Sequence, residues 1–143
     1  MSIQSILDRN GGDVITIRPT ETVRSAADRM RARSIAALVV TSGDAIRGLI
    51  SERDIVHAIS HHGEQALAMA VIDIVPHTTF TVAPGDTVRH AMSLMTNQRV
   101  RHLPVLADGK LVGIVSIGDV VKHRLEELET ESNVLRDAYI AAH

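Results

Sequence analysis

Two short stretches, GLISERD and GIVSIGD, hold the side chains best suited to binding chemistry. Each places a serine three residues before an aspartate: Ser51 and Asp54 in the first, Ser116 and Asp119 in the second. A serine followed by an acid at this spacing is typical of a helix cap. The same helix start presents unpaired N–H groups and a partial positive charge to a phosphate. The serine hydroxyl can donate to that phosphate, and an ionised carboxylate, which only accepts hydrogen bonds, suits the hydroxyls of a ribose.

Capping and binding are compatible, so a single copy would indicate only a helix cap. The two copies, however, belong to a longer internal repeat. Residues 16–56 align with residues 81–121 at a constant offset of 65 and without a gap. Identical pairs include Thr16/Thr81, Pro19/Pro84, Val23/Val88, Met30/Met95, Gly48/Gly113, Ser51/Ser116 and Asp54/Asp119. A duplicated unit with the same serine and aspartate predicts two equivalent sites.

Each copy predicts the order β-α-β-β-α, led by a short helical turn. A proline, Pro19 or Pro84, closes a brief first strand. The spacing of Val23, Ala26 and Met30, repeated in the second copy, makes one apolar stripe of a helix. Two β-rich runs around a glycine turn then predict a hairpin, residues 36–50 and 102–115. One such unit cannot bury both faces of its sheet, so we expect the two copies to pack together.

The stretches PTETV, PGDTV, RHLPVL, GLISERD and GIVSIGD resemble a tandem pair of cystathionine-β-synthase (CBS) domains, over roughly residues 1 to 124. The resemblance implies an α+β fold of α/β-type CBS repeats. Two β-α-β-β-α repeats would pack sheet to sheet with pseudo-two-fold symmetry, followed by a C-terminal helix. We therefore expect a first CBS repeat at residues 1–65, a second at 66–124 and the helix at 125–143.

The resemblance also implies a function. In this family, clefts between the two repeats bind adenosine-containing ligands: AMP, ADP, ATP, NAD(H) or S-adenosylmethionine. It implies a regulatory or sensor protein that signals to an unknown partner through ligand-dependent conformational change and assembles as a homodimer of CBS pairs. The ligand would not act as a catalytic cofactor. The alternative is a purely structural dimerisation module without ligand.

Two clefts follow from the resemblance, each built from both repeats. One would hold Ser116, Asp119 and Arg101, with Ile15, Ile35, Ala36 and Ala37 around the base. The other would hold Ser51, Arg53 and Asp54, with Phe80, Val100, Arg101 and His102 around the base. Gly118 stands where the first copy has Arg53, and Ala36 and Ala37 stand where the second has Arg101 and His102. We therefore predict two adenine-nucleotide sites of unequal affinity.

Composition argues against several other functions. The 143 residues include no cysteine, which excludes disulfides and thiolate chemistry and favours the cytoplasm. His57 and His61 are four residues apart, but no HExxH pattern accompanies them, so we expect no metal site.

The basic string RMRAR at residues 29–33 is expected to be a solvated helix face, because base-stacking aromatic residues are almost absent and the net charge is −2. No nucleophile elbow or P-loop is present, so we predict no enzyme activity. No apolar run could span a membrane, and no signal peptide is recognisable.

The C-terminal segment lies outside the repeat. Its residues Leu125, Leu128, Ser132, Leu135, Tyr139 and Ala142 recur at intervals of three and four, a short heptad-like stripe. A helix this short is marginal when exposed. We expect it to pack either on its own module or on a second subunit.

Overall fold

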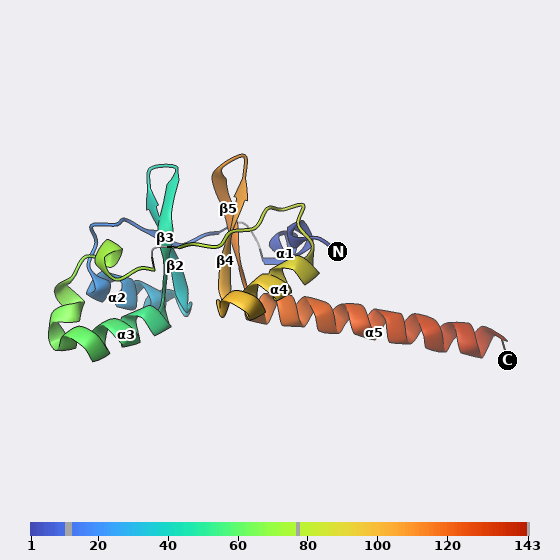
Figure 1. Cartoon of the computed structure of the whole chain (residues 1–143). Coiled ribbons are helices and arrows are strands. Elements are labelled where there is room, and N and C mark those ends of the chain that lie inside the picture. Colours follow the sequence, from blue (N-terminus) through green and yellow to red (C-terminus); the bar gives the residue numbers. More distant parts are fainter. Residues whose placement is uncertain (11–12, 77, 143) are drawn as a thin grey trace.

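The structure is a computed structural model that describes residues 1–10, 13–76 and 78–142. The elements of the first half are α1 (Ile3–Asn10), β1 (Thr16–Ile17), α2 (Val23–Arg33), β2 (Ala37–Ser42), β3 (Ala45–Ser51) and α3 (Glu52–His62). Two 3-10 turns follow, η1 (Gly63–Ala68) and η2 (Val71–Asp73). The second half has α4 (Val88–Gln98), β4 (His102–Ala107), β5 (Lys110–Ser116) and α5 (Ile117–Ala142). Figure 1 shows two hairpins side by side at the centre, with the helices below and outside them.

The two hairpins form two small sheets, as the repeat predicts. In the first sheet the strand order is β1-β2-β3, with β1 parallel to β2 and β2 antiparallel to β3. The second sheet consists of β4 and β5 alone. The brief first strand predicted for the second copy is only an isolated parallel bridge between Val82 and Val105. Residues 83–86 then turn back on themselves: the Ala83 N–H donates to the Asp86 side chain, and the Asp86 N–H donates to the Ala83 carbonyl. The same turn follows β1 at residues 18–21.

The repeat extends to the helix ends. Thr22 and Thr87 are the N-caps of α2 and α4, and each side chain accepts a backbone N–H three residues on. Both helices also end in a left-handed residue, Ser34 with φ 54° and Arg99 with φ 54°. These positions are again 65 residues apart in the sequence. The same local geometry therefore leads from each helix into the first strand of each hairpin.

The helical segment that leads each repeat packs on the other repeat. Ile3 and Ile6 of α1 belong to the core of the second half, with Val88 and Leu103. Val71, in η2, belongs to the core of the first half. The sequence placed each turn before its own copy along the chain and made no prediction about the core on which the turn packs. The apolar spacing of these turns fits either core, so the sequence alone does not determine which core covers them.

Matching hydrogen bonds fix the exchanged segments. The Ile3 N–H donates to the Asp86 carbonyl at 2.8 Å, and the Val71 N–H donates to the Glu21 carbonyl at 2.8 Å. The helical segments also run close to the glycines of the repeated stretches. A Cβ on Gly113 would lie 2.4 Å from a Leu7 methyl group, so a side chain at residue 113 would require Leu7 of α1 to shift. Residues 1–65 and 66–124 thus describe the two repeats along the sequence, whereas each hydrophobic core contains residues from both repeats.

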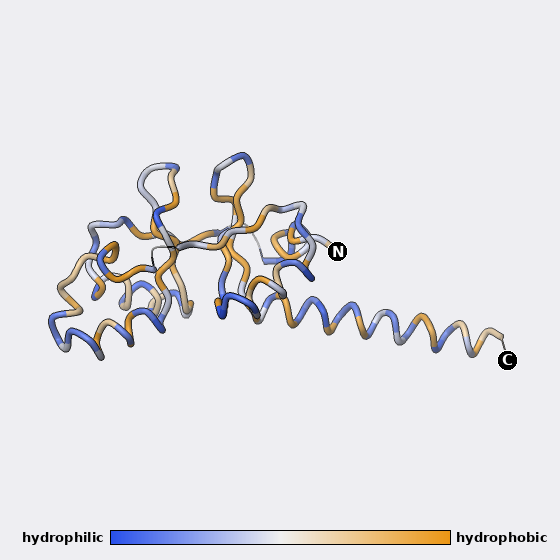
Figure 2. The backbone as a smooth tube through the Cα atoms, in the orientation of Figure 1, coloured by the Kyte–Doolittle hydropathy of each residue, from blue (hydrophilic) through white to orange (hydrophobic). Residues whose placement is uncertain are grey.

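The sheets are buried on both faces where the repeats meet. Ala37, Leu38, Val39 and Val40 are all buried along β2, although side chains of a strand alternate between faces. Leu38 and Val40 enter the core beneath the helices, whereas Val39, with no exposed surface, belongs to neither helix-covered core. Figure 2 shows the same arrangement, with hydrophobic residues in the body of the hairpins and polar residues at their tips. The expected packing of sheet against sheet is confirmed.

The last helix is longer than the repeat requires. The second helix of the second copy and the C-terminal segment form one continuous helix, α5, of 26 residues. Its first part packs on the body through Val120 and His123, and Glu126 forms an ion pair with Arg9 of α1. Residues 128–142 are all exposed, and Figure 1 shows this part extending away from the body. Packing of the C-terminal helix on its own module, one of the two expectations, is therefore wrong for these residues. Among the described residues, no helix is long and apolar enough to cross a membrane.

Candidate functional site

The repeated serine and aspartate form a capping box at the start of α3. The Asp54 N–H donates to Ser51 Oγ at 3.3 Å, and the Ser51 N–H donates to Asp54 Oδ2 at 2.8 Å. The Ser51 hydroxyl also donates to Asp54 Oδ2, at 2.9 Å. Donation of this hydroxyl to a phosphate, as we expected, would therefore require it to leave Asp54.

The second copy has the same backbone geometry at the start of α5. The Ser116 N–H donates to Asp119 Oδ2 at 2.9 Å, and the Asp119 N–H donates to Ser116 Oγ at 3.1 Å. Each helix start is also joined to the residue before its hairpin. The Glu52 N–H donates to the Ala36 carbonyl, and the Ile117 N–H donates to the Arg101 carbonyl. The two candidate sites are thus built alike.

A cleft of about 640 Å³ opens beside the start of α3, and we name it the α3 cleft. This volume lies within the range of small-molecule sites, about 300–1,000 Å³. The structure brings together here every residue that the sequence assigns to one of the two predicted sites: Ser51, Arg53, Asp54, Phe80, Val100, Arg101 and His102. The first three come from the first repeat and the other four from the second. The cleft is therefore shared between the repeats.

The residues predicted for the other site lie elsewhere, except for Ala36 and for Arg101, which was predicted for both sites; these two line the α3 cleft. Ser116, Gly118 and Asp119 are at the β5–α5 junction. The predicted base-wall residues Ile15, Ile35 and Ala37 lie before β1, before β2 and at the start of β2. Ala37 pairs with Ser51 across its hairpin in the same register in which His102 pairs with Ser116.

Several lining residues of the α3 cleft were not predicted: Leu49, Glu52, Val56, His57, Pro76, Thr78, Thr79, Arg99 and Pro104. His57 was interpreted only as a surface histidine, yet it follows Asp54 by three residues and so shares its face of α3. Arg99 adjoins the predicted residues Val100 and Arg101, and this proximity was a usable signal. The threonines belong to the segment that links the repeats, which the repeat alignment did not cover.

The charge of the α3 cleft differs from that of the chain. Arg53, Arg99 and Arg101 stand against Glu52 and Asp54, an excess of one positive charge, whereas the whole chain has a net charge of −2. Burial lowers the pKa of His102 below its ordinary value of 6.5, an effect that the carboxylates of Asp119 and Glu52 oppose and Arg101 adds to. A neutral imidazole in a cleft that three arginines line can accept or donate a hydrogen bond without adding charge.

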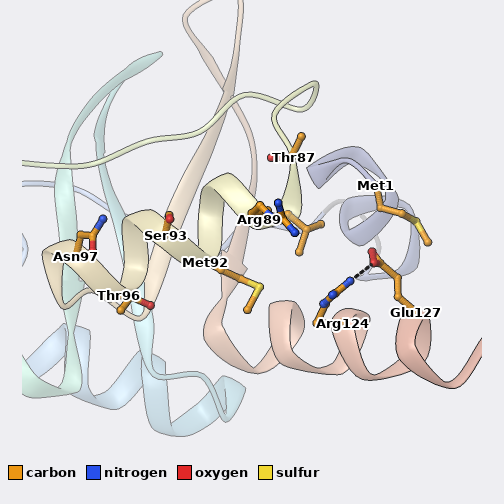
Figure 3. A pocket seen from close by; sticks show the side chains of 10 residues that line it. Met1, Thr87, Arg89, Met92, Ser93, Thr96, Asn97, Arg124 and Glu127 are labelled. Carbon is orange, nitrogen blue, oxygen red and sulfur yellow. Dashed lines mark hydrogen bonds and ion pairs between the residues drawn. The ribbon is translucent and has the colours of Figure 1, made fainter. Parts of the chain in front are cut away.

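A second cavity, of about 580 Å³, lies between α4 and α5 (Figure 3). Its lining includes Met1, Met92 and Arg89, and none of the predicted site residues. Arg124 points toward Glu127, and the two form an ion pair at 2.9 Å. With Arg89, Arg124 and Glu127 in its lining, this cavity has the same excess of one positive charge as the α3 cleft. The α3 cleft is the better candidate because the predicted residues of one site gather there from both repeats.

Other candidates from the sequence also have a place in the structure. Within the described residues, no group of three or more His, Cys, Asp or Glu side chains is arranged to hold a metal ion. In the string RMRAR, Arg31 and Arg33 are exposed as expected, but Arg29 is partly buried. Its guanidinium donates to Glu21 Oε1 at 2.7 Å and to the Thr16 carbonyl at 2.8 Å. Arg29 therefore ties α2 to β1, and its hydrogen bond holds the pKa of Glu21 below the ordinary 4.5.

Comparison with known proteins agrees with this architecture. The CBS domain family matches the chain twice, at residues 5–61 and 71–126. The chain is 38% identical over 125 residues to a mitochondrial CBS domain-containing protein of Arabidopsis thaliana, covering 84% of the chain but only 60% of that protein. A CBS-domain containing protein from Agrobacterium tumefaciens superposes with a TM-score of 0.84 at 37% identity, over 87% of this chain and 99% of that one.

One solved structure bears on the ligand. A CBS domain protein from Pyrobaculum aerophilum, in complex with AMP, superposes with a TM-score of 0.79 at 25% identity, over 92% of this chain and 99% of that one. The two family matches, the internal repeat and the paired sheets agree. This chain belongs to the CBS domain family and consists of a tandem pair of CBS domains.

Proposed function

We propose that the chain is a regulatory module that binds an adenosine-containing ligand, AMP, ADP, ATP or NAD(H), in the α3 cleft. The observation that carries the proposal is the composition of this cleft, which joins a helix start, arginines and an acid to apolar side chains of the other repeat. Support comes from the AMP complex of the related Pyrobaculum protein. The purely structural alternative leaves the excess positive charge of the cleft without a role.

The phosphate would bind at the first turn of α3. Two of the amides there are already used: the Glu52 N–H donates to the Ala36 carbonyl, and the Asp54 N–H donates to Ser51. Among the first helical residues, the Arg53 N–H is the one left to face a ligand. The Arg53 and Arg101 guanidinium groups, both in the lining, add charge-assisted hydrogen bonds.

The ribose would bind at Asp54. Its Oδ2 atom accepts the Ser51 N–H and hydroxyl, and within the described chain no hydrogen bond reaches Oδ1. The capping box thus holds the carboxylate in place while one oxygen stays available to ribose hydroxyls. The aspartate can therefore be a cap and a ligand-binding residue at once.

The adenine ring would contact apolar side chains on the far wall of the cleft. Phe80 and Val100 are partly buried against the core of the second repeat, and Leu49 and Pro104 also line the cleft. A ligand held in this way touches both repeats. It would stabilise one arrangement of the two repeats over others, which is how binding could signal to the unknown regulated protein.

Three further properties are proposed by analogy with the CBS domain family. The ligand is bound and not converted, so no residue is assigned a catalytic role. A second, weaker site at Ser116 and Asp119 remains a prediction, as does assembly into a homodimer of CBS pairs. The cytoplasm is the proposed compartment, because a cysteine-free chain gains nothing from an oxidising one.

Calorimetric titration with AMP, ADP, ATP, NADH and S-adenosylmethionine tests the proposal. Adenosine, which lacks the phosphate, and ribose 5-phosphate, which lacks the base, should both bind more weakly than AMP. The matched variants are Arg53→Gln and Arg47→Gln, because both arginines are exposed but only Arg53 lines the cleft. Loss of one charge-assisted hydrogen bond, about 1.5–3 kcal/mol, should raise the Kd of Arg53→Gln about 10- to 150-fold. An unchanged Kd in both variants, or no binding of any ligand by the wild type, would overturn the proposal.

A further inference from the structure

The outer half of α5 carries an exposed apolar stripe. We name as the α5 stripe the residues Leu125, Leu128, Ser132, Leu135, Tyr139 and Ala142. The exposed fraction is 56% for Leu125 and 71% for Leu135, large values for leucine side chains. At 3.6 residues per turn, intervals of three and four keep these residues on one face of the helix. They correspond to the a and d positions of three successive heptads.

The α5 stripe does not face the body of its own chain. The buried or half-buried residues of α5 after Asp119 are Val120, His123, Arg124, Glu126 and Glu127, and Glu126 pairs with Arg9 of α1. They occupy the c, f, g, b and c positions, and none of them is at an a or d position. Residues 127–142 also lie beyond the segment that matches the CBS domain family. An exposed helical extension of this length is marginal by itself. A partner that covers the stripe would stabilise it without a clash with the body.

The charges beside the α5 stripe indicate which partner fits. The flanking g positions are Arg124 and Glu131, and the flanking e positions are Glu129 and Arg136. In a parallel, in-register pair of helices, each g position faces the e position five residues later in the other helix. Arg124, which in the single chain pairs with Glu127 of its own helix, then faces Glu129 of the second copy, and Glu131 faces Arg136 of the second copy. All four pairs formed in this way have opposite charges.

Antiparallel pairing fits less well. If Ser132 faces Leu135 of the second copy, Glu131 faces Ala138 and two of the four ion pairs are lost. If Leu125 faces Leu128 instead, Tyr139 extends beyond the point where α5 of the second copy begins, at Ile117. Parallel pairing alone covers the whole stripe and matches all four charges.

We propose that the α5 stripe is a self-association surface, which pairs with α5 of a second copy as a parallel, in-register coiled coil. The homodimer is part of the proposed function, and this pairing supplies its contact surface. The inference therefore rests on the proposed function to that extent. Surface ion pairs contribute little affinity, so the leucines supply the attraction and the charges set the direction. The two modules then lie at the same end of the coiled coil, on its outer sides.

The absence of cysteine from the chain allows a direct test by disulfide formation. Ser132→Cys places a thiol at an a position, where it faces its own copy in the parallel pair. Asn133→Cys, the control, places a thiol one residue away and outside the stripe; both positions are exposed. After mild oxidation, non-reducing electrophoresis of the full chain should show several-fold more linked dimer for Ser132→Cys.

Equal yields from the two cysteine variants would overturn the proposal. So would a mixture of Ser132→Cys and Leu135→Cys chains that links only unlike chains, because that result belongs to antiparallel pairing. Sedimentation equilibrium provides a second measure: Leu135→Glu should raise the dimer Kd several-fold more than Val134→Glu, whose side chain is 61% exposed but off the stripe. Nucleotide titration is independent of both readouts. A chain that binds nucleotide without this linkage overturns only the interface, and a linked chain that binds no ligand overturns only the proposed function.

Discussion

Asp54→Asn is the substitution that best separates ligand binding from helix capping. Asparagine keeps a side-chain oxygen for the Ser51 N–H but loses the carboxylate charge. Because the free Oδ1 of Asp54 is assigned to the ribose, one hydrogen bond to a charged group weakens or is lost, at about 1.5–3 kcal/mol. The Kd of the α3 cleft for AMP should therefore rise about 10- to 150-fold.

The matched control is Asp119→Asn. Asp119 forms the same cap on α5, with its Oδ2 accepting the Ser116 N–H at 2.9 Å against 2.8 Å in the first copy. Each substitution removes a negative charge from the positive end of a helix, which costs about 0.3–1 kcal/mol of stability. The two variants should thus lose similar stability, a few degrees in Tm at most.

Isothermal titration calorimetry with AMP, together with thermal denaturation of the ligand-free proteins, measures both effects. We expect equal shifts in Tm and a large difference in the Kd of the tighter site. If both variants bind AMP with the wild-type Kd, Asp54 does not contact the ribose. If both weaken the tighter site equally, the effect comes from helix capping and the assignment of the α3 cleft is wrong.

Two further predictions concern stability. Gly113→Val should lower the free energy of unfolding by about 1–3 kcal/mol in urea denaturation, because a side chain there meets Leu7 of α1. The control Gly85→Ala should change the free energy of unfolding little, because a Cβ there has nothing within 4 Å. Equal effects of the two substitutions would argue against the exchanged position of α1. Burial lowers the pKa of His102 in the folded state, so the unfolded chain binds the proton more readily. The stability of the wild type therefore falls as the pH drops below 6.5, and His102→Gln should flatten this pH dependence. Parallel pH profiles of the free energy of unfolding for wild type and variant would contradict that role.

The repeat and most of its local structure follow from the sequence alone. The offset of 65 residues predicted two copies of one unit, and the predicted hairpins and capping boxes appear at matching positions. These features depend on a few neighbouring residues, which is why they can be inferred from spacing alone. The grouping of Ser51, Arg53 and Asp54 with Phe80 and the residues before β4 followed from the family resemblance, and the structure places them around one cleft.

Features that depend on contacts between distant segments could be seen only in the folded chain. The apolar turns at Ile3 and Val71 suit either core, and only the folded chain exchanges them between repeats. In the second copy the first strand is reduced to a single bridge between Val82 and Val105, which the repeat did not predict. The heptad-like spacing of α5 was visible in the sequence, but only the structure shows that the stripe faces away from the body. Periodicity defines a face of a helix, whereas the neighbours that cover that face depend on how the whole chain packs.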